Sequence, residues 1–215
     1  MNAKRVVKPG LEEGDEAPIR QRILEAAFSA FMERGFAETS TLEIATRARA
    51  SKRELYAQFG SKQEMLAACI EERAKRLRMP ADWPELSNRE TLSRALVAFG
   101  TNLLREISEP TVVAVFRLAI AEAVRAPEVA SALNNVGIAA SRSALHDLMT
   151  RARAAKLIGG EPAEMAEHFV GLLWGSQMIN LLLRVAERPA PREIARRAEA
   201  AATAFLRAYA LCSQG

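Results

Sequence analysis

The 215-residue sequence is poor in the residues from which metal centres and disulfide frameworks are built. Its two cysteines, Cys69 and Cys212, lie far apart, and neither belongs to a Cys-x-x-Cys pair or a Cys/His cluster. We therefore expect two reduced thiols, no metal and no cofactor. The sequence also lacks the Gly-x-Ser-x-Gly, P-loop and His-Glu-x-x-His motifs, so it offers no catalytic residues and predicts a protein that is not an enzyme.

Long apolar runs are absent as well. The most hydrophobic stretch, residues 169–183, is interrupted by Ser176, Gln177 and Asn180 and is shorter than the roughly 18 residues that cross a bilayer. The N-terminal segment "MNAKRVVKPGLEEGDEAP" has cations but not the apolar core of a secretory signal. These absences predict a cytoplasmic protein without a membrane partner.

The charge of the chain is small overall but unevenly distributed. The formal net charge is +4, and the sequence pI is near 9.4. Between Thr39 and Lys62 five cations face only two acids, Glu43 and Glu54. Most of the positive surplus lies there, which permits a polyanionic partner without requiring one.

Apolar residues recur at helical spacing along most of the chain, and 49% of the residues are hydrophobic, enough for a buried core. Residues 1–17 show no such period and predict a mobile arm. We expect an all-α fold of about nine helices, with breaks at glycine- and proline-containing segments. The expected helices run from about residue 19 to a stop at Gly35, then over about 39–48, 51–59, 62–78, 88–108, 111–125, 128–155, 162–186 and 191–211.

Two short helices with a tight join are expected between Thr39 and Lys62. Thr39, Ser40 or Thr41 can cap the first, whose buried face would carry Leu42, Ala45 and Ile44. Ser51 opens the second, and Glu54 completes a capping box, a device that Ser61 and Glu64 repeat. This spacing is typical of a helix-turn-helix, in which the second helix can enter the major groove of DNA.

The second helix has the two sides that such a reading helix needs. Leu55 and Phe59 supply an inward apolar side, whereas Lys52, Arg53 and Tyr56 supply outward donors. Lys62, in the first turn of the next helix, could hold a phosphate together with free backbone N–H groups. The pattern is equally compatible with two capped amphipathic helices that carry ordinary solvated lysines.

The stretch "RQRILEAAFSAFMERGFAETSTLEIATRARASKRELYAQFGSKQEML", residues 20–66, resembles the N-terminal DNA-binding domain of TetR-family transcriptional regulators. The resemblance implies a helix-turn-helix domain at 18–65 and a helical regulatory and dimerisation domain at 66–215. It implies phosphate contacts from Ser40 or Thr41, Tyr56 and Lys62, and base contacts from Lys52 and Arg53. The candidate DNA-binding residues are Ser40, Thr41, Ser51, Lys52, Arg53, Tyr56 and Lys62.

The sequence departs from the family pattern within the turn. Arg49 stands where glycine is usual, and a side chain at positive φ there would cost on the order of 1 kcal/mol. Ala50 replaces a larger apolar residue, and Glu54 stands where threonine is common. The target DNA sequence does not follow from the resemblance.

The helix expected over 162–186 is apolar nearly all round, so it must be covered on more than one side. The last helix has a stripe of small residues, and the resemblance implies a two-fold interface built from these two helices, matched to a palindromic operator. Burial of both helices in the core of one chain remains the alternative. The candidate interface residues are Gly171, Trp174, Gly175, Leu182, Ala198, Ala201, Phe205 and Tyr209.

The segment 116–137 and the later "GLLWG" resemble, more loosely, the C-terminal domain of the AefR-like branch of the family. A regulator of this kind usually has a ligand cavity among its middle helices. For His146 and Arg117 a position on the surface is the alternative to a place in this cavity, and for Trp174 the alternative is the core or an interface. The candidates for that cavity are Phe99, Asn102, Phe116, Arg117, His146, Trp174 and Met178.

The sequence therefore predicts a homodimeric, DNA-binding repressor that an unknown small molecule releases from its operator. Two alternatives stay open. One is a regulator of the same family without a small-molecule inducer, and the other is a helical interaction module that does not bind DNA.

Overall fold

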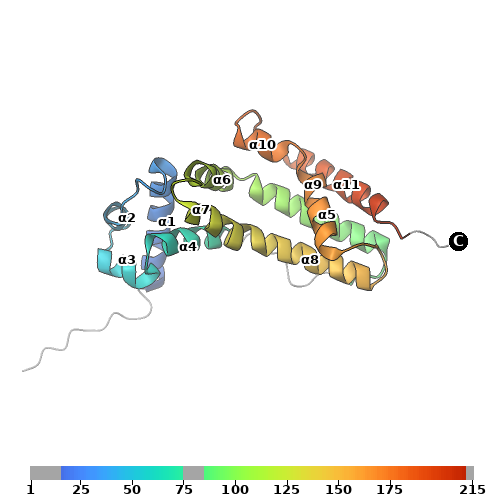
Figure 1. The fold of residues 1–215 in the computed structure, drawn as a ribbon, viewed down its shortest axis with the longest axis horizontal. Helices are drawn as coiled ribbons and strands as arrows, with labels where there is room; N and C mark the ends of the chain where they lie inside the picture. The colour runs from blue at the N-terminus through green and yellow to red at the C-terminus, as the bar shows by residue number, and fades with distance from the viewer. Residues whose placement is uncertain (1–15, 75–84, 212–215) are drawn as a thin grey trace, which may run out of the picture. The chain divides into compact units, whose positions relative to one another are not determined.

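The computed structural model describes residues 16–74 and 85–211 (Figure 1). Within those ranges the regular elements are helices, so the all-α prediction is confirmed. The chain divides into two compact units, residues 1–69 and 70–215. The predicted arm lies almost entirely outside the described residues, as does Cys212, and the predicted functional division after residue 65 stays a prediction. No helix of the described ranges has the length and apolar character that crossing a membrane requires.

The first unit contains three complete helices and the start of a fourth, which ends in the second unit: α1 (Glu16–Arg34), α2 (Thr41–Ala48), α3 (Lys52–Phe59) and α4 (Lys62–Ala74). Side chains from all four helices form its core. The fully buried members include Ile23, Phe31, Ile44, Leu55 and Met65. Cys69 is a buried thiol whose Sγ donates to the carbonyl oxygen of Leu24, which fits its expected role as a small apolar residue.

The expected stop after α1 is confirmed. Gly35 has a φ of 84°, which L side chains rarely adopt, and its N–H donates to the carbonyl oxygen of Phe31. One detail of α2 was predicted wrongly: Ile44, Ala45 and Ala48 form its buried face, whereas Leu42 is 58% exposed. In a helix of only two turns, the apolar period does not fix which side meets α1.

The second unit is built from long and short helices around a single apolar core. Its helix α11 packs along α5 and against α9, and α8 packs against α9 (Figure 1). The core is lined by Phe99, Phe169 and Phe205, all buried. The helices are α5 (Arg89–Ile107), α6 (Pro110–Glu122), α7 (Pro127–Ala132), the π-helix η2 (Leu133–Ile138), α8 (Ala139–Ala154), α9 (Pro162–Trp174), α10 (Gln177–Leu182) and α11 (Pro191–Ala208).

Two of the long helices predicted from sequence are divided in the structure. The helix expected over 128–155 changes its hydrogen-bond spacing through η2, and the helix expected over 162–186 is broken at Gly175. Gly175 has φ 46° and ψ −127°, a backbone conformation open in practice to glycine alone. The apolar pattern continues across the break, which is why sequence periodicity does not reveal it.

Two arginines stabilise the ends of the helices that the break creates. Arg197 of α11 donates to the carbonyl oxygen of Trp174 at 3.2 Å, at the end of α9. Arg117 of α6 donates to the carbonyl oxygen of Leu182 at 3.0 Å, at the end of α10. Cations placed at helix C-termini satisfy free carbonyls and interact favourably with the helix dipole.

Candidate functional site

Two serine caps fix the start of α2 and the start of α3. Ser40 Oγ accepts a hydrogen bond from the Glu43 N–H, and Ser51 Oγ accepts one from the Glu54 N–H, each at 3.1 Å. Glu54 returns the bond to the Ser51 N–H at 2.7 Å, so the predicted capping box is present. Ser61 caps α4 in the same way by accepting from the Glu64 N–H.

The turn between α2 and α3 depends on the residue that replaces glycine. Arg49 has φ 52° and ψ 44°, the left-handed conformation predicted for it, and the N–H groups of Arg49 and Ala50 donate to carbonyls of the last turn of α2. Leu55 and Phe59 then turn inward and are buried, as predicted. Because Leu55 and Phe59 are buried, the first turn of α3 is left exposed to solvent.

The outward side of α3 carries unpaired donors. Lys52 and Arg53 are exposed and make no hydrogen bond or ion pair with any residue the structure describes. One turn later Tyr56 is 46% exposed, and its hydroxyl lies 3.3 Å from the hydroxyl of Thr41 in α2. The structure thus brings together the residues expected to contact DNA on α2 and α3.

Lys62 does not present its ammonium group as the sequence suggests. Its Nζ donates to the carbonyl oxygens of Phe36 at 2.9 Å and Thr39 at 3.1 Å, and lies 4.5 Å from the centre of the Phe36 ring. The ammonium therefore holds the segment between α1 and α2. Its phosphate contact stays a prediction, and in this structure that ammonium already has partners.

An ion-pair network ties α2 to α1 beneath this surface. One guanidinium nitrogen of Arg47 lies 2.7 Å from Glu33 of α1 and 2.7 Å from Glu43 of α2. The hydrogen bond from Arg47, with a second from Ser29, lowers the pKa of Glu33 from 4.5 to about 2. The network therefore links α2 to α1 by charged groups near neutral pH.

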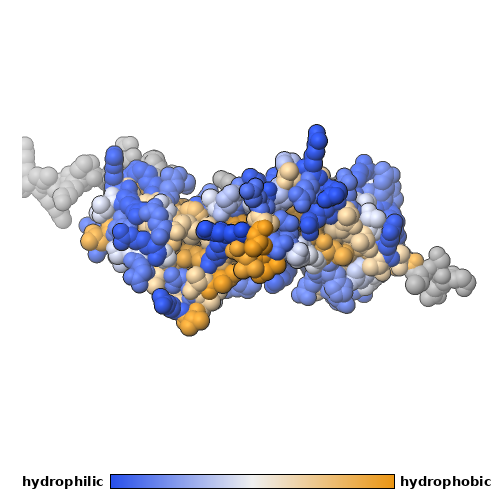
Figure 2. Space-filling view, turned by 90° about the horizontal axis from the view of Figure 1, so that it is seen from above, coloured by the Kyte–Doolittle hydropathy of each residue, from blue (hydrophilic) through white to orange (hydrophobic). Residues whose placement is uncertain are grey.

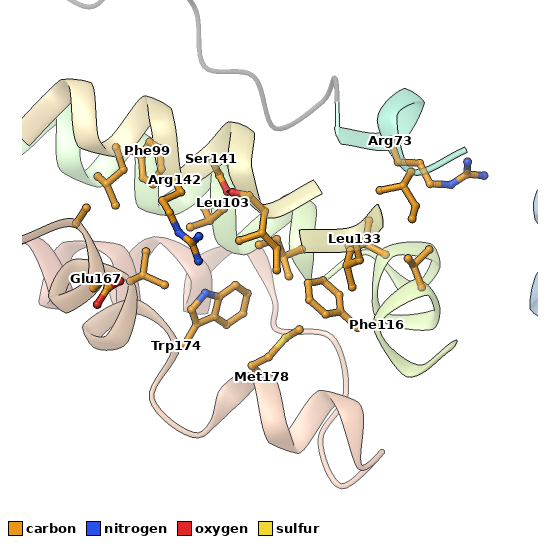
Figure 3. A pocket seen from close by; sticks show the side chains of 18 residues that line it. Arg73, Phe99, Leu103, Phe116, Leu133, Ser141, Arg142, Glu167, Trp174 and Met178 are labelled. Carbon is orange, nitrogen blue, oxygen red and sulfur yellow. The ribbon is translucent and has the colours of Figure 1, made fainter. Parts of the chain in front are cut away.

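A cavity of about 400 Å³ lies in the second unit (Figure 3). Its walls come from the last turn of α4 and from α5, α6, η2, α8, α9 and α10, and they are mainly apolar. Aromatic and sulfur-containing side chains line much of it, namely Phe99, Phe116, Trp174 and Met178. This size and character suit a small organic molecule.

Those four residues were predicted to line a cavity, and the structure brings them together. The other three candidates lie elsewhere. Arg117 caps α10, Asn102 accepts a hydrogen bond from Arg105 at 2.5 Å, and His146 is exposed beside Asp147. Sequence analysis missed Ser141, Arg142 and Glu167, although Ile138, Ser141, Arg142 and Leu145 have the spacing of one helix face and could have been found together.

The residues proposed for a dimer interface also separate into two groups. Ala198 and Phe205 are fully buried in the core of their own chain. Ala201 is buried as well but lines a surface groove with Leu172, and its place in a dimer interface stays a prediction. Trp174 lines the cavity, and Leu182 and Tyr209 are half-buried. Gly171 and Gly175 are exposed, although Gly175 ends α9 rather than continuing its face.

An apolar surface instead runs over the exposed sides of α9, α10 and α11. Leu172 borders a groove with Ala200, Ala201 and Ala204 of α11, which the charged residues Glu193, Arg196 and Arg197 also line. An added Cβ on Gly171 would meet no atom within 4 Å. Ile179, Leu183 and Val185 continue it at exposures of 50%, 63% and 70%. Figure 2 shows hydrophobic residues gathered on the face toward which α10 lies in Figure 1. Such a contiguous patch is typical of a surface that another molecule covers.

Comparison with known families identifies the chain. Residues 94–211, more than half of its length, match the family described as the C-terminal domain of AefR-like transcriptional repressors, and residues 23–69 match bacterial regulatory proteins of the tetR family. The chain belongs to the TetR family of transcriptional regulators. The resemblance predicted from residues 20–66 is confirmed.

Solved structures of other TetR-family proteins share this fold. The flavonoid-responsive regulator FrrA superposes with a TM-score of 0.78 at 29% identity, over 92% of this chain and 100% of its own. A regulator from Agrobacterium tumefaciens gives 0.74 at 26% identity, over 90% and 95%. One from Mesorhizobium loti gives 0.73 at 26%, over 92% and 99%. Comparison with curated protein sequences gives no match.

Proposed function

We propose that this TetR-family protein is a homodimeric repressor that binds a palindromic DNA operator and leaves it when a small molecule enters the cavity. The observation that carries the proposal is the pair of exposed, unpaired cations, Lys52 and Arg53, at the outward start of α3. In the proposed complex they reach base edges in the major groove. Ser40, Thr41 and Ser51 at the helix starts, and Tyr56 one turn into α3, contact phosphates.

Effector control is supported by the course of α4. This helix begins with Lys62 in the first unit, and its last turn contributes Ile70 and Arg73 to the cavity wall in the second. A ligand that fits only one position of α4 shifts the population away from the DNA-binding form. FrrA, similar over nearly its whole length, is flavonoid-responsive by name, which supports an effector here without identifying it.

Dimerisation is supported by the apolar surface of α9, α10 and α11. Small residues such as Gly171 and Ala204 let two helix pairs approach closely across a two-fold axis. Two copies of α3 then read half-sites about 34 Å apart, or a multiple of that spacing. We place the protein in the cytoplasm because its proposed partner is the bacterial chromosome.

The test begins by selecting tightly bound fragments from a pool of random duplexes. We expect an inverted repeat, bound with an affinity that falls steeply as salt rises. Arg53→Ala should reduce discrimination at one base-pair position by about 1–3 kcal/mol, whereas Lys52→Gln should reduce the salt dependence by about one ion. Failure to retain any duplex at low salt, with both variants matching wild type, would favour a helical interaction module instead.

A further inference from the structure

The charged residues of the cavity wall are few, and they differ in where they point. Among the described lining residues only Arg73, Arg142 and Glu167 carry a charge. Figure 3 shows the Arg73 side chain leading away from the cavity, at the end marked by Leu133. Arg142 of α8 and Glu167 of α9 lie at the opposite end, near Trp174.

Arg142 is exposed, and no described residue pairs with its guanidinium group. It makes no hydrogen bond or ion pair with a residue in 16–74 or 85–211, and α8 carries no acid within one turn of it. In Figure 3 the guanidinium is directed into the cavity, toward the indole of Trp174. Two other arginines of this unit, Arg117 and Arg197, are occupied by main-chain carbonyls. Arg142 is therefore available to a molecule inside the cavity.

Glu167 lies across from Arg142 but does not neutralise it. The two side chains line the same cavity without forming an ion pair. A guanidinium presents paired N–H groups in one plane, a geometry that matches a carboxylate or sulfonate. Behind it the wall is apolar and aromatic, through Phe99, Phe116 and Trp174. An occupant that uses both features has an apolar body and one anionic end.

We propose that the effector is an amphipathic organic anion whose aromatic or aliphatic body fills the apolar cavity and whose acidic group binds Arg142. The inference rests on the proposed function in one respect, that this cavity is the effector site. The cavity volume of about 400 Å³ fits one small organic acid but not a long lipid. Glu167, facing the same space, weakens binding of the anionic end by repulsion and accepts a hydrogen bond from any hydroxyl nearby.

Two dyes with the same rings test this directly. The sulfonate 8-anilino-1-naphthalenesulfonate and the neutral N-phenyl-1-naphthylamine differ only in the anionic group. Trp83 lies outside the described residues, and Trp83→Phe leaves Trp174 as the one tryptophan of the full chain, so quenching of its fluorescence reports occupancy of the cavity. Each dye is titrated into the Trp83→Phe protein and into Trp83→Phe variants that carry one further substitution.

The expected results have opposite signs for the two charged residues. Arg142→Gln should weaken sulfonate binding by about 3- to 10-fold, because the guanidinium is partly screened by solvent, and leave the neutral dye unchanged. Glu167→Gln should tighten sulfonate binding by a smaller factor. Arg142→Lys, which keeps the charge but not the paired donors, should fall between wild type and Arg142→Gln. Arg105→Gln, an exposed arginine of α5 paired with Glu106, should change neither affinity.

Three results would overturn the proposal: failure of both dyes to bind, equal weakening of both dyes by Arg142→Gln, or equal effects of Arg142→Gln and Arg105→Gln. The titration needs no DNA, so its outcome separates from that of the proposed function. If the protein binds no duplex but Arg142→Gln still weakens only the sulfonate dye, the proposed regulatory function is wrong and the anion site stands. If the protein binds duplex normally but Arg142→Gln does not distinguish the dyes, only the anion site is wrong.

Discussion

The hydroxyl of Tyr56 in α3 lies 3.3 Å from the hydroxyl of Thr41 in α2, so the reading helix and the helix before it meet through a polar contact at the surface. Thr41 follows the Ser40 cap directly, where the free N–H groups of α2 begin. Two hydroxyls and a helix start are therefore held together at one point. A DNA phosphate placed there would find donors from both helices.

Tyr56→Phe removes one of those donors while keeping the ring. We expect DNA affinity to fall about five-fold on every duplex, because a phosphate hydrogen bond contributes on the order of 1 kcal/mol and carries no sequence information. The salt dependence should not change, since the hydroxyl is neutral. Fluorescence anisotropy on an operator and a scrambled duplex measures both quantities. Unaltered binding to both duplexes would show that Tyr56 only packs the two helices together.

Lys62→Met should destabilise the protein by about 1–3 kcal/mol, because the carbonyls of Phe36 and Thr39 lose a charged donor. Urea denaturation measures the change. Lys52→Met is the matched control, since the exposed Lys52 makes no contact of this kind within the described residues and should shift stability by less than about 0.5 kcal/mol. If Lys62→Met leaves stability intact and instead lowers the salt dependence of DNA binding, the ammonium serves a phosphate.

Glu33 makes the stability of the first unit depend on acid pH. Arg47 lowers the pKa of Glu33 from 4.5 to about 2 in the folded chain, so its contribution is complete above about pH 4.5 and disappears as the pH falls toward 2. Glu33→Gln should therefore be less stable than wild type at pH 7, and the difference should shrink by pH 3. Glu25→Gln, an exposed carboxylate of the same helix bonded to Gln21, is the control. A gap between wild type and Glu33→Gln that stays constant with pH would contradict this account.

Gly175→Ala should lower the free energy of unfolding by about 1–3 kcal/mol. Space is not the reason, because an added Cβ would lie 3.7 Å from its nearest neighbour, a nitrogen of Arg197. The cost comes from φ 46° and ψ −127°, which a side chain does not tolerate. Gly171→Ala one turn earlier is regular helix with open space, and should be neutral or stabilise by up to about 1 kcal/mol. Equal effects of the two substitutions on thermal denaturation would argue against a break at Gly175.

Ala204→Arg places a long cation in the groove that Ala204 shares with Leu172. If a second copy covers this groove, the change should convert dimer to monomer at micromolar concentration, because a partner would bury an unpaired charge. Sedimentation velocity measures the conversion. Thr150→Arg, on the exposed side of α8, adds the same charge elsewhere and should leave the dimer intact. A dimer that survives Ala204→Arg would assign the apolar surface to another occupant.

The sequence by itself determined the features that depend on residues a few positions apart. The Ser51 and Glu54 capping box and the stop at Gly35 are each set within one or two turns. Local hydrogen bonds and backbone sterics are the same wherever the helix docks, so these predictions hold without knowledge of the rest of the chain.

Only the tertiary structure decided which side of each helix is covered. The apolar pattern runs through Gly175 without interruption, yet α9 ends there, and Arg197 from α11 donates to the carbonyl oxygen of Trp174 at that end. The tertiary structure also places Phe205 in the core and leaves Ala204 exposed, and it brings Arg142 rather than Arg117 to the cavity. These outcomes depend on contacts between residues far apart in the chain, and the spacing of residues along one helix contains no information about its neighbours.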